Sequence, residues 1–190
     1  MSLTFSIVIP NFNSGAVIER AIRSLLDQDY PNLQLIVTDA GSNDISREII
    51  ERYSSHFEAI IAEKDNGQAD GLNKGFALAT GEIWGWLCAD DALLPGALEH
   101  VANIFKKKPE VDVVTGSCER VFEDGTTLIT AADPDAFKKI GIQNLIEQPS
   151  TFWKGELHQK LGILDLSYYL GFDWDLWARM SRSGARLVTT

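Results

Sequence analysis

Two adjacent carboxylates, Asp90 and Asp91, follow an apolar run at residues 83–87. Neighbouring carboxylates repel each other, so such a pair usually needs a cation or a hydrogen-bond donor nearby. Hard divalent cations take oxygen ligands, and Mg²⁺ is often held by one or two carboxylates together with substrate phosphates. One carboxylate could cap the helix expected around Pro95, but a cap rarely needs both. The pair therefore predicts a divalent-cation site held by one or both of these carboxylates.

Other polar side chains stand directly after two further apolar runs. Pro10 and Asn11 follow the first run, and Asp39 comes just past residues 33–37. In open α/β sheets, ligands bind beyond the carboxyl ends of the strands. Each residue alone could serve an ordinary turn or cap, but their joint placement predicts a single crevice that also receives Asp90 and Asp91.

The segment Asp65–Gly75 is rich in glycine and in side chains that form hydrogen bonds. It contains Asp70, Asn73 and Lys74 and leads into a predicted helix, whose N-terminus favours anions. The segment could meet a diphosphate or a sugar, or it could be an ordinary loop that caps a helix. Its spacing alone does not separate the two interpretations.

These polar groups need a scaffold, and the first half of the chain alternates between strand and helix patterns. Such an alternation predicts an α/β fold with a mostly parallel central sheet flanked by helices. Beyond about residue 115 the pattern changes to a hairpin around Asp124-Gly125 and a more irregular segment. We expect one domain over residues 1–190, with the change of pattern separating residues 1–115 from residues 116–190. Residues 5–10, 33–37, 57–62, 83–87, 111–114 and 185–190 are the expected strands, and the stretches after Ser14 and at 44–53, 70–79, 95–107, 134–139, 154–161 and 173–183 are the expected helices.

Composition excludes several partners and compartments. The 17 basic and 27 acidic residues give a formal net charge of −10, which disfavours binding to nucleic acid. No apolar run is long enough to span a membrane, and no signal peptide is visible. Cys88 and Cys118 lie far apart, so a disulfide framework is not expected. We therefore expect a cytoplasmic protein, with peripheral contact to the inner face of the membrane as an option.

Three common site motifs do not occur. Pro10–Gly15 stands where a dinucleotide-binding domain would carry Gly-x-Gly-x-x-Gly, and no Gly-Lys-Ser/Thr phosphate loop follows a strand. The three histidines are dispersed, which disfavours a histidine zinc site. A nucleotidyltransferase could use a similar acidic pair, but the first loop lacks the basic residues that a triphosphate would need.

Six stretches, in this order along the chain, are similar to glycosyltransferase family 2, whose members have the GT-A fold. They cover most of the chain and are Ser6–Asn13, Asp39–Asp44, Asp65–Gly75, Gly81–Asp91, Gln148–Trp153 and Gly171–Arg179. The resemblance implies an inverting transferase that moves a sugar from a nucleoside diphosphate sugar to an acceptor hydroxyl. It further implies that residues 1–115 bind the donor, with a UDP-sugar slightly favoured, and that residues 116–190 face a sugar or lipid-linked acceptor. Surface polysaccharide or glycolipid assembly is the expected pathway class.

The resemblance also assigns residue roles. Asp173 would be the catalytic base, and Asp91 with Asp90 would hold Mn²⁺ or Mg²⁺. Gln148 and Trp174 would line the acceptor side. The residues implied in nucleotide-sugar binding are Pro10, Asn11, Asn13, Asp39, Asp70, Asn73, Lys74 and Asp90.

This sequence departs from the family pattern at several places. Ala40 stands where many members have a second acidic residue, Cys88 stands where the acidic metal motif often begins, and Phe172 precedes the expected base. The Gln-x-x-Arg-Trp motif of processive members is absent, so repeated polymerisation is not expected. Many members also extend beyond the position of Thr190, so the chain could be truncated. The departures keep open the alternative of a non-catalytic sugar-nucleotide-binding module.

Overall fold

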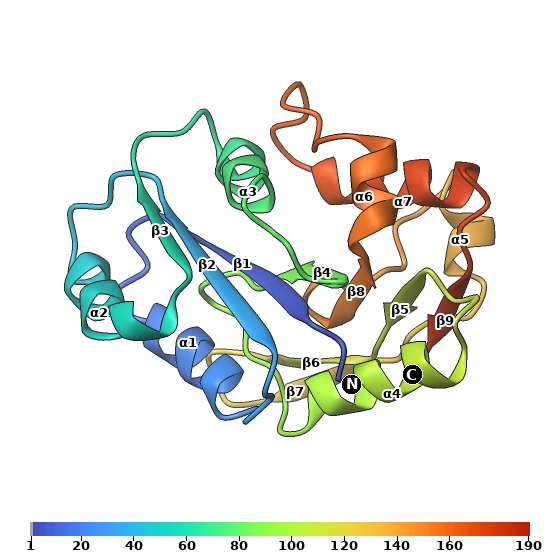
Figure 1. Cartoon of the computed structure of the whole chain (residues 1–190), viewed down its shortest axis with the longest axis horizontal. Coiled ribbons are helices and arrows are strands. Elements are labelled where there is room, and N and C mark those ends of the chain that lie inside the picture. The colour runs from blue at the N-terminus through green and yellow to red at the C-terminus, as the bar shows by residue number, and fades with distance from the viewer. Residues whose placement is uncertain (1) are drawn as a thin grey trace.

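The computed structural model describes residues 2–190, and a seven-stranded sheet forms its middle layer (Figure 1). Strand β8 is antiparallel to its neighbours β4 and β5, whereas all the other neighbouring strands of this sheet are parallel. The predicted mixed α/β fold with a mostly parallel sheet is therefore confirmed. In spatial order the strands are β3 (Ala59–Ala62), β2 (Leu33–Asp39), β1 (Phe5–Asn11), β4 (Ile83–Trp86), β8 (Thr151–Lys154), β5 (Val113–Thr115) and β9 (Leu187–Thr189).

Helices cover both faces of the sheet, which explains why its strands are continuous apolar runs. In β1, Ile7 and Ile9 enter one hydrophobic cluster, and Val8 between them enters the other. One face carries α1 (Ile18–Leu26), α2 (Ser46–Arg52) and α4 (Ala97–Lys107) (Figure 1). The other carries α3 (Gln68–Phe76), α5 (Ala136–Lys139), α6 (Gly155–Leu161) and α7 (Phe172–Arg182), and short 3₁₀ turns lie at Ser54–His56 and Gln148–Ser150.

Helix α3 packs unusually close to the sheet. A Cβ on Gly75 would lie 2.5 Å from Cγ1 of Val8, and a Cβ on Gly71 would lie 2.7 Å from Oδ2 of Asp65. A larger residue at Gly75 would push the helix away from β1. One at Gly71 would displace the Asp65 side chain and crowd Oγ1 of Thr38 in β2, which would lie 3.3 Å away. The two glycines thus bring the helix, which begins at Gln68, against the strands that end at the candidate site.

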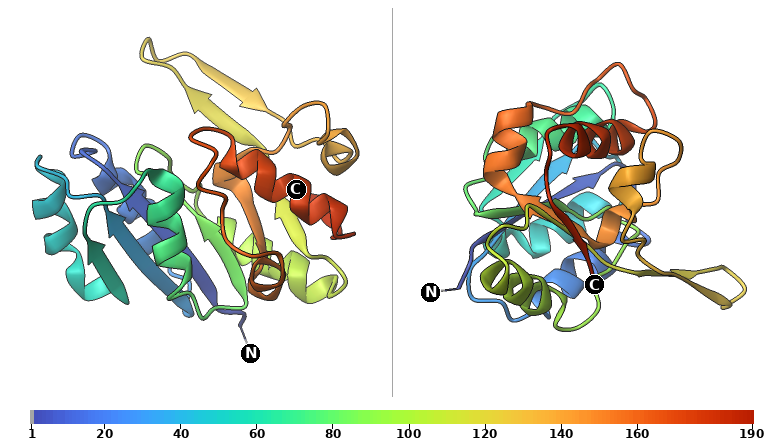
Figure 2. Two further views of the ribbon diagram at one scale, coloured as in Figure 1. Left: turned by 90° about the horizontal axis from the view of Figure 1, so that it is seen from above. Right: turned by 90° about the vertical axis from the view of Figure 1, so that its right-hand side faces the viewer.

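Strand β8 is the one strand of the central sheet that the sequence analysis did not predict. Residues 148–153 were singled out as a motif, but four residues with no alternation carry too little periodic signal for a strand. The predicted hairpin is confirmed as β6 (Cys118–Val121) and β7 (Thr127–Thr130), and Figure 2 shows it projecting from the rest of the molecule. Among residues 2–190, none of the helices has the length and apolar character needed to cross a membrane.

Aromatic side chains fill the space between β4, β8 and the helices α6 and α7. Trp86 stacks on Trp177 with ring centroids 5.6 Å apart, and Trp153 meets Trp177 edge to face. Trp177 is fully buried. His158 lies among these rings, 4.8 Å from Phe76, and its Nδ1 has no hydrogen-bond partner among the described residues. Burial lowers the pKa of His158 to about 4.

We predict that His158 makes the fold sensitive to acid. The folded chain binds this proton more weakly than the unfolded chain, so the contribution of His158 to the free energy of unfolding falls as the pH drops from about 6.5 toward 4. The loss should be on the order of 3 kcal/mol as an upper bound. Urea unfolding at several pH values would measure it, and His158→Gln should flatten the profile. The exposed His56→Gln serves as the control, and an equally steep profile in His158→Gln would contradict the prediction.

Candidate functional site

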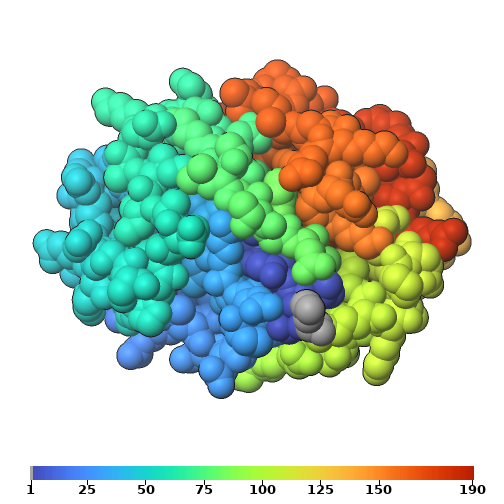
Figure 3. Space-filling model, viewed as in Figure 1, coloured from blue at the N-terminus to red at the C-terminus, as the bar shows by residue number. Residues whose placement is uncertain are grey.

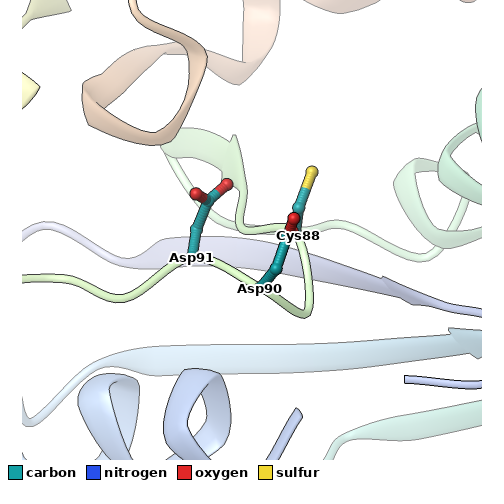
Figure 4. Close-up of side chains that lie close together, drawn as sticks. All are labelled: Cys88, Asp90 and Asp91. Atoms are coloured by element: carbon teal, nitrogen blue, oxygen red, sulfur yellow. The ribbon is translucent and has the colours of Figure 1, made fainter. Parts of the chain in front are cut away.

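Cys88, Asp90 and Asp91 form a cluster on the loop that follows β4 (Figure 4). One potential ligand atom from each side chain lies within 4.8 Å of the other two. Asp90 is exposed, whereas Cys88 and Asp91 are half-buried. The loop leaves the sheet beside β1, because the amide of Leu87 still donates to the carbonyl of Val8.

The electrostatic surroundings of Asp91 disfavour its negative charge. Burial, and then the neighbouring carboxylates of Asp90 and Glu147, raise the pKa of Asp91 to about 6, although the guanidinium of Arg20 opposes the shift. Burial and the same aspartates raise the pKa of the Cys88 thiol to about 12, so the thiol stays neutral. Two adjacent carboxylates with only one nearby guanidinium fit a hard divalent cation that also takes oxygen ligands from a substrate. The neutral thiol adds no third charge.

Arg20 and Glu147 belong to this site, and the sequence analysis did not find them. The Arg20 guanidinium donates a hydrogen bond to the backbone carbonyl oxygen of Asp90. Glu147 forms a 3.1 Å ion pair with Arg120 of the hairpin. Both contacts join segments that are far apart in the chain. No local spacing could have revealed them, because Arg20 has the pattern of an exposed helix position.

Two glutamines surround the Cys88 thiol. Gln68, at the start of α3, donates to Sγ at 3.2 Å, and the thiol donates to Oε1 of Gln148 at 3.5 Å. Gln148 also donates to the carbonyl of Trp86 at 2.7 Å. Gln148, which we expected on the acceptor side, thus contacts the Cys88–Asp91 loop directly, and α3 is joined to the same loop.

A second group of polar side chains lies at the ends of β1 and β2. Asn11 and Asp39 are opposite each other in the strand register, and Nδ2 of Asn11 donates to Oδ1 of Asp39 at 2.7 Å. Asp39 also accepts from the backbone amide of Ser42 at 3.1 Å. Both Asn11 and Asp39 are almost fully buried. Their side chains therefore hold the two loops together at the edge of the proposed crevice.

The neighbouring loop residues are partly committed to the same network. Asn13 has a φ of 50°, and its Oδ1 accepts from the amide of Asn43 at 2.9 Å. Helix α1 begins at Ile18, and none of the described side chains caps it. Pro10 is half-buried within β1, and Phe12 beside it is 62% exposed. Phe12 is a flat apolar surface that the sequence analysis did not single out.

The three polar residues expected from α3 have different surroundings. Asp70 accepts from the amide of Asn66 at 2.9 Å, which is the main cause that lowers its pKa. Lys74 pairs with Glu63 at 2.9 Å and lies 3.7 Å from Asp70. The Asn73 side-chain amide instead forms hydrogen bonds with the backbone of Leu164, in the second half of the chain. The three do not form one anion-binding surface.

Asp173 and Trp174 lie in the first turn of α7. Oδ2 of Asp173 accepts from Nδ2 of Asn144 at 3.1 Å, and the carboxylate is half-buried. The indole of Trp174 donates to the carbonyl of Ile140 at 2.6 Å and is 37% exposed. A carboxylate held by one amide can accept a proton from a hydroxyl group, which is the chemistry expected of a general base.

Comparison with known sequences identifies a family. The sequence pattern described as "Glycosyl transferase family 2" matches residues 6–159. The chain is 28% identical over 186 residues to an uncharacterized glycosyltransferase of Rickettsia prowazekii, covering 93% of this chain but 58% of that protein. It is 30% identical over 189 residues to a PGL/p-HBAD biosynthesis glycosyltransferase of Mycobacterium tuberculosis, covering 97% of this chain and 72% of that protein.

Solved structures share the fold at low sequence identity. TarS residues 1–349 from S. aureus, in complex with UDP, superimpose with a TM-score of 0.78 and 19% identity over 99% of this chain and 58% of that chain. A mannosyltransferase from Pyrobaculum calidifontis, in complex with GDP-Man and Mn²⁺, gives 0.76 and 22% over 100% of this chain and 55% of that chain. These neighbours confirm the GT-A fold. The chain spans just over half the length of the first relatives that it matches.

We predict that Asp91→Asn stabilises the chain when no divalent cation is present. The carboxylate costs free energy in its ionised form, so the contribution of Asp91 to the wild-type free energy of unfolding should fall as the pH rises from about 4 to about 6. The gain in Asp91→Asn at pH 7.5 should be on the order of 1 kcal/mol, allowing for solvent screening. Urea unfolding in a chelating buffer would measure it, with Asp124→Asn on the distant hairpin as control. A less stable Asp91→Asn would mean that the carboxylate has a compensating partner.

Proposed function

The chain belongs to glycosyltransferase family 2, and on that premise we propose that it transfers a sugar from a nucleoside diphosphate sugar to an acceptor hydroxyl with inversion at the anomeric carbon. The observation that carries the proposal is the cluster of Cys88, Asp90 and Asp91 at the carboxyl edge of the parallel sheet. Its uncompensated carboxylates suit a cation and a diphosphate, and a candidate base lies in the other half of the chain.

Residues 1–115 would bind the donor. The nucleoside fits the loops joined by Asn11 and Asp39, where the exposed ring of Phe12 offers a stacking surface for a base. Pro10 and Asn13 shape the same loops, and we favour a UDP-sugar as donor. Asp70 and Lys74 flank this side on α3, where Lys74 is engaged by Glu63.

Asp91, with Asp90, would hold a divalent cation, Mn²⁺ or Mg²⁺. When bound, such a cation supplies Lewis-acid stabilisation of the negative charge on a departing diphosphate. The exposed Asp90 carboxylate lies close to that of Asp91, and the neutral Cys88 thiol would leave the remaining positions to oxygen ligands from the substrate. Two protein carboxylates with substrate phosphates match the usual way in which Mg²⁺ is held.

Residues 116–190 would bind the acceptor, with Asp173 as the general base. As the acceptor oxygen attacks the anomeric carbon, Asp173 takes its proton, and the bond from that carbon to the diphosphate oxygen breaks. Asn144 orients the carboxylate through its 3.1 Å hydrogen bond. Gln148, which contacts the Cys88 thiol, and Trp174 on α7 would line the acceptor side. We place the activity on the cytoplasmic side of a membrane, in the assembly of a surface polysaccharide or glycolipid.

We predict that Asp173→Asn retains donor binding and loses transfer. The substitution removes the base and preserves the shape of the side chain, so turnover should fall by about 10²–10⁴-fold. Donor binding is measured as the thermal shift with UDP, GDP, dTDP and CDP, each with and without Mn²⁺. A nucleotide at about 100 times its dissociation constant should add roughly 2.7 kcal/mol to the free energy of unfolding.

The outcomes distinguish the proposal from a non-catalytic binding module. The exposed Glu51→Gln on α2, on the opposite face of the sheet, also removes one carboxylate charge and is the comparison variant. Nucleotide binding without hydrolysis or transfer in the wild-type chain would favour the binding module. If none of the four nucleotides binds, the proposed donor site is wrong.

The acceptor side also carries an apolar surface. Tyr169 and Leu170 are 85% and 80% exposed on the loop that leads into α7, only a few residues before Asp173. Contact of these side chains with water is unfavourable, at about 25 cal/mol per Å². We therefore favour a lipid-linked acceptor over a free glycan, since its apolar part would cover this surface.

We predict that Tyr169→Ser and Leu170→Ser raise the KM for an acceptor with a long alkyl tail by about tenfold, because about 1.4 kcal/mol of apolar contact would be lost. The KM for the same glycan without the tail should not change. The exposed Leu78→Ser, at the far end of α3, is the matched control. Equal effects of the loop variants on both acceptors would contradict a lipid-linked substrate.

A further inference from the structure

The side chain of Asn73 is held through both its nitrogen and its oxygen by one residue of the other half of the chain. Its Nδ2 donates to the carbonyl of Leu164 at 2.9 Å, and its Oδ1 accepts from the amide of Leu164 at 2.8 Å. An amide side chain can serve both backbone groups at once, since it carries a donor and an acceptor. The contact joins α3 to the segment that leaves α6, and Figure 3 shows these two parts of the surface side by side.

Arg179 holds the same segment from α7. Its Nη1 donates to the carbonyls of Leu161 and Gly162 at 3.0 and 3.3 Å, and its Nη2 donates to that of Ile163 at 3.1 Å. Asp175 orients the guanidinium through a 2.8 Å ion pair. Because α6 ends at Leu161, Arg179 satisfies backbone carbonyls that a helix C-terminus leaves without partners.

The held segment is the root of the loop that leads to Asp173. The side chain of Leu164 is fully buried, whereas every residue from 165 to 170 is exposed. Gly171, with a φ of 81°, then turns the chain into α7. The loop is therefore fixed at its root by Asn73 and Arg179 and at its other end by α7, with the exposed part between them.

Helix α3 also reaches the Cys88 loop. Gln68 at its first residue donates to the Cys88 thiol at 3.2 Å, and Gly75 keeps the helix tightly packed on β1. Asn73 lies on this same rigid element. A single helix thus connects the loop of Asp90 and Asp91 to the root of the loop that precedes Asp173.

We propose that Asn73 and Arg179 are positioning residues that hold the root of this loop and, through it, the acceptor beside Asp173, and that Asn73 is not a ligand of the donor. The proposal rests on the proposed function for the identity of the acceptor. The positioning itself is a property of the hydrogen bonds to residues 161–164. Loss of either residue should misplace the acceptor without weakening the nucleotide.

Asn73→Asp is the sharpest variant, because it keeps the acceptor for the Leu164 amide but places a carboxylate against the Leu164 carbonyl. Arg179→Lys preserves the charge but cannot span three carbonyls. Both should speed hydrogen exchange in residues 161–171 and lower kcat/KM for the acceptor by about tenfold to a hundredfold. The dissociation constant of the nucleotide should stay within about twofold of wild type. Asn103→Ala, at a half-buried position of α4, is the matched control.

Each readout can overturn the proposal. A nucleotide dissociation constant raised about tenfold in Asn73→Asp, with unchanged exchange in residues 161–171, would make Asn73 a donor ligand. If hydrogen exchange in residues 161–171 is faster but kcat/KM for the acceptor is unchanged, the contact between Asn73 and Leu164 has only a structural role. Circular dichroism shows whether each variant is folded, and Arg179→Lys decides the question if Asn73→Asp does not fold. If the wild-type chain neither binds nucleotides nor transfers sugar, the proposed function fails, while the exchange measurement still tests the hold on the loop.

Discussion

Parallel pairing of β1 with β2 and β4 is the constraint on which the candidate site depends. The register places Asn11 opposite Asp39, and the Leu87 amide continues the β4 pairing to the carbonyl of Val8. Because parallel strands end at a common edge, the loops after all three strands meet there. A shift of one residue in any pair would turn its buried side chains to the opposite face. Packing on both faces of the sheet therefore fixes which polar groups come together at that edge.

The carboxylates of Asp39 and Asp91, which both lie at this edge of the sheet, have opposite surroundings. Asp39 is almost fully buried and accepts hydrogen bonds from Asn11 and from the amide of Ser42. Such bonds satisfy the charged form and join the loops. Asp91 has acidic neighbours instead, and its pKa is raised to about 6. The Asp39 carboxylate therefore joins two loops through hydrogen bonds. The negative charge of Asp91 is disfavoured by its neighbours and suits a bound cation.

The sequence predicted most of the elements because their apolar residues repeat at the expected spacing over a long enough stretch, as in α1 and α4. It failed at β8, which has four residues and takes its strand conformation from β4 and β5 on either side. Among the site residues, the adjacent pair Asp90 and Asp91 could be found because its signal is local. The roles of Arg20, Glu147 and Asn73 could not, since each depends on a contact with a segment at least 50 residues away.

The position of β8 explains why the charge on Asp91 depends on both halves of the chain. The strand inserts between β4 and β5 and carries the preceding residues, Glu147 and Gln148, to the Cys88 loop. Glu147 disfavours the ionised form of Asp91, and Arg120 of the hairpin partly compensates Glu147 through their 3.1 Å ion pair. A cation at Asp91 would therefore relieve repulsion between a donor-side and an acceptor-side carboxylate. Because the two halves share one continuous sheet, such a change in charge acts on residues of both, without any movement of a linker.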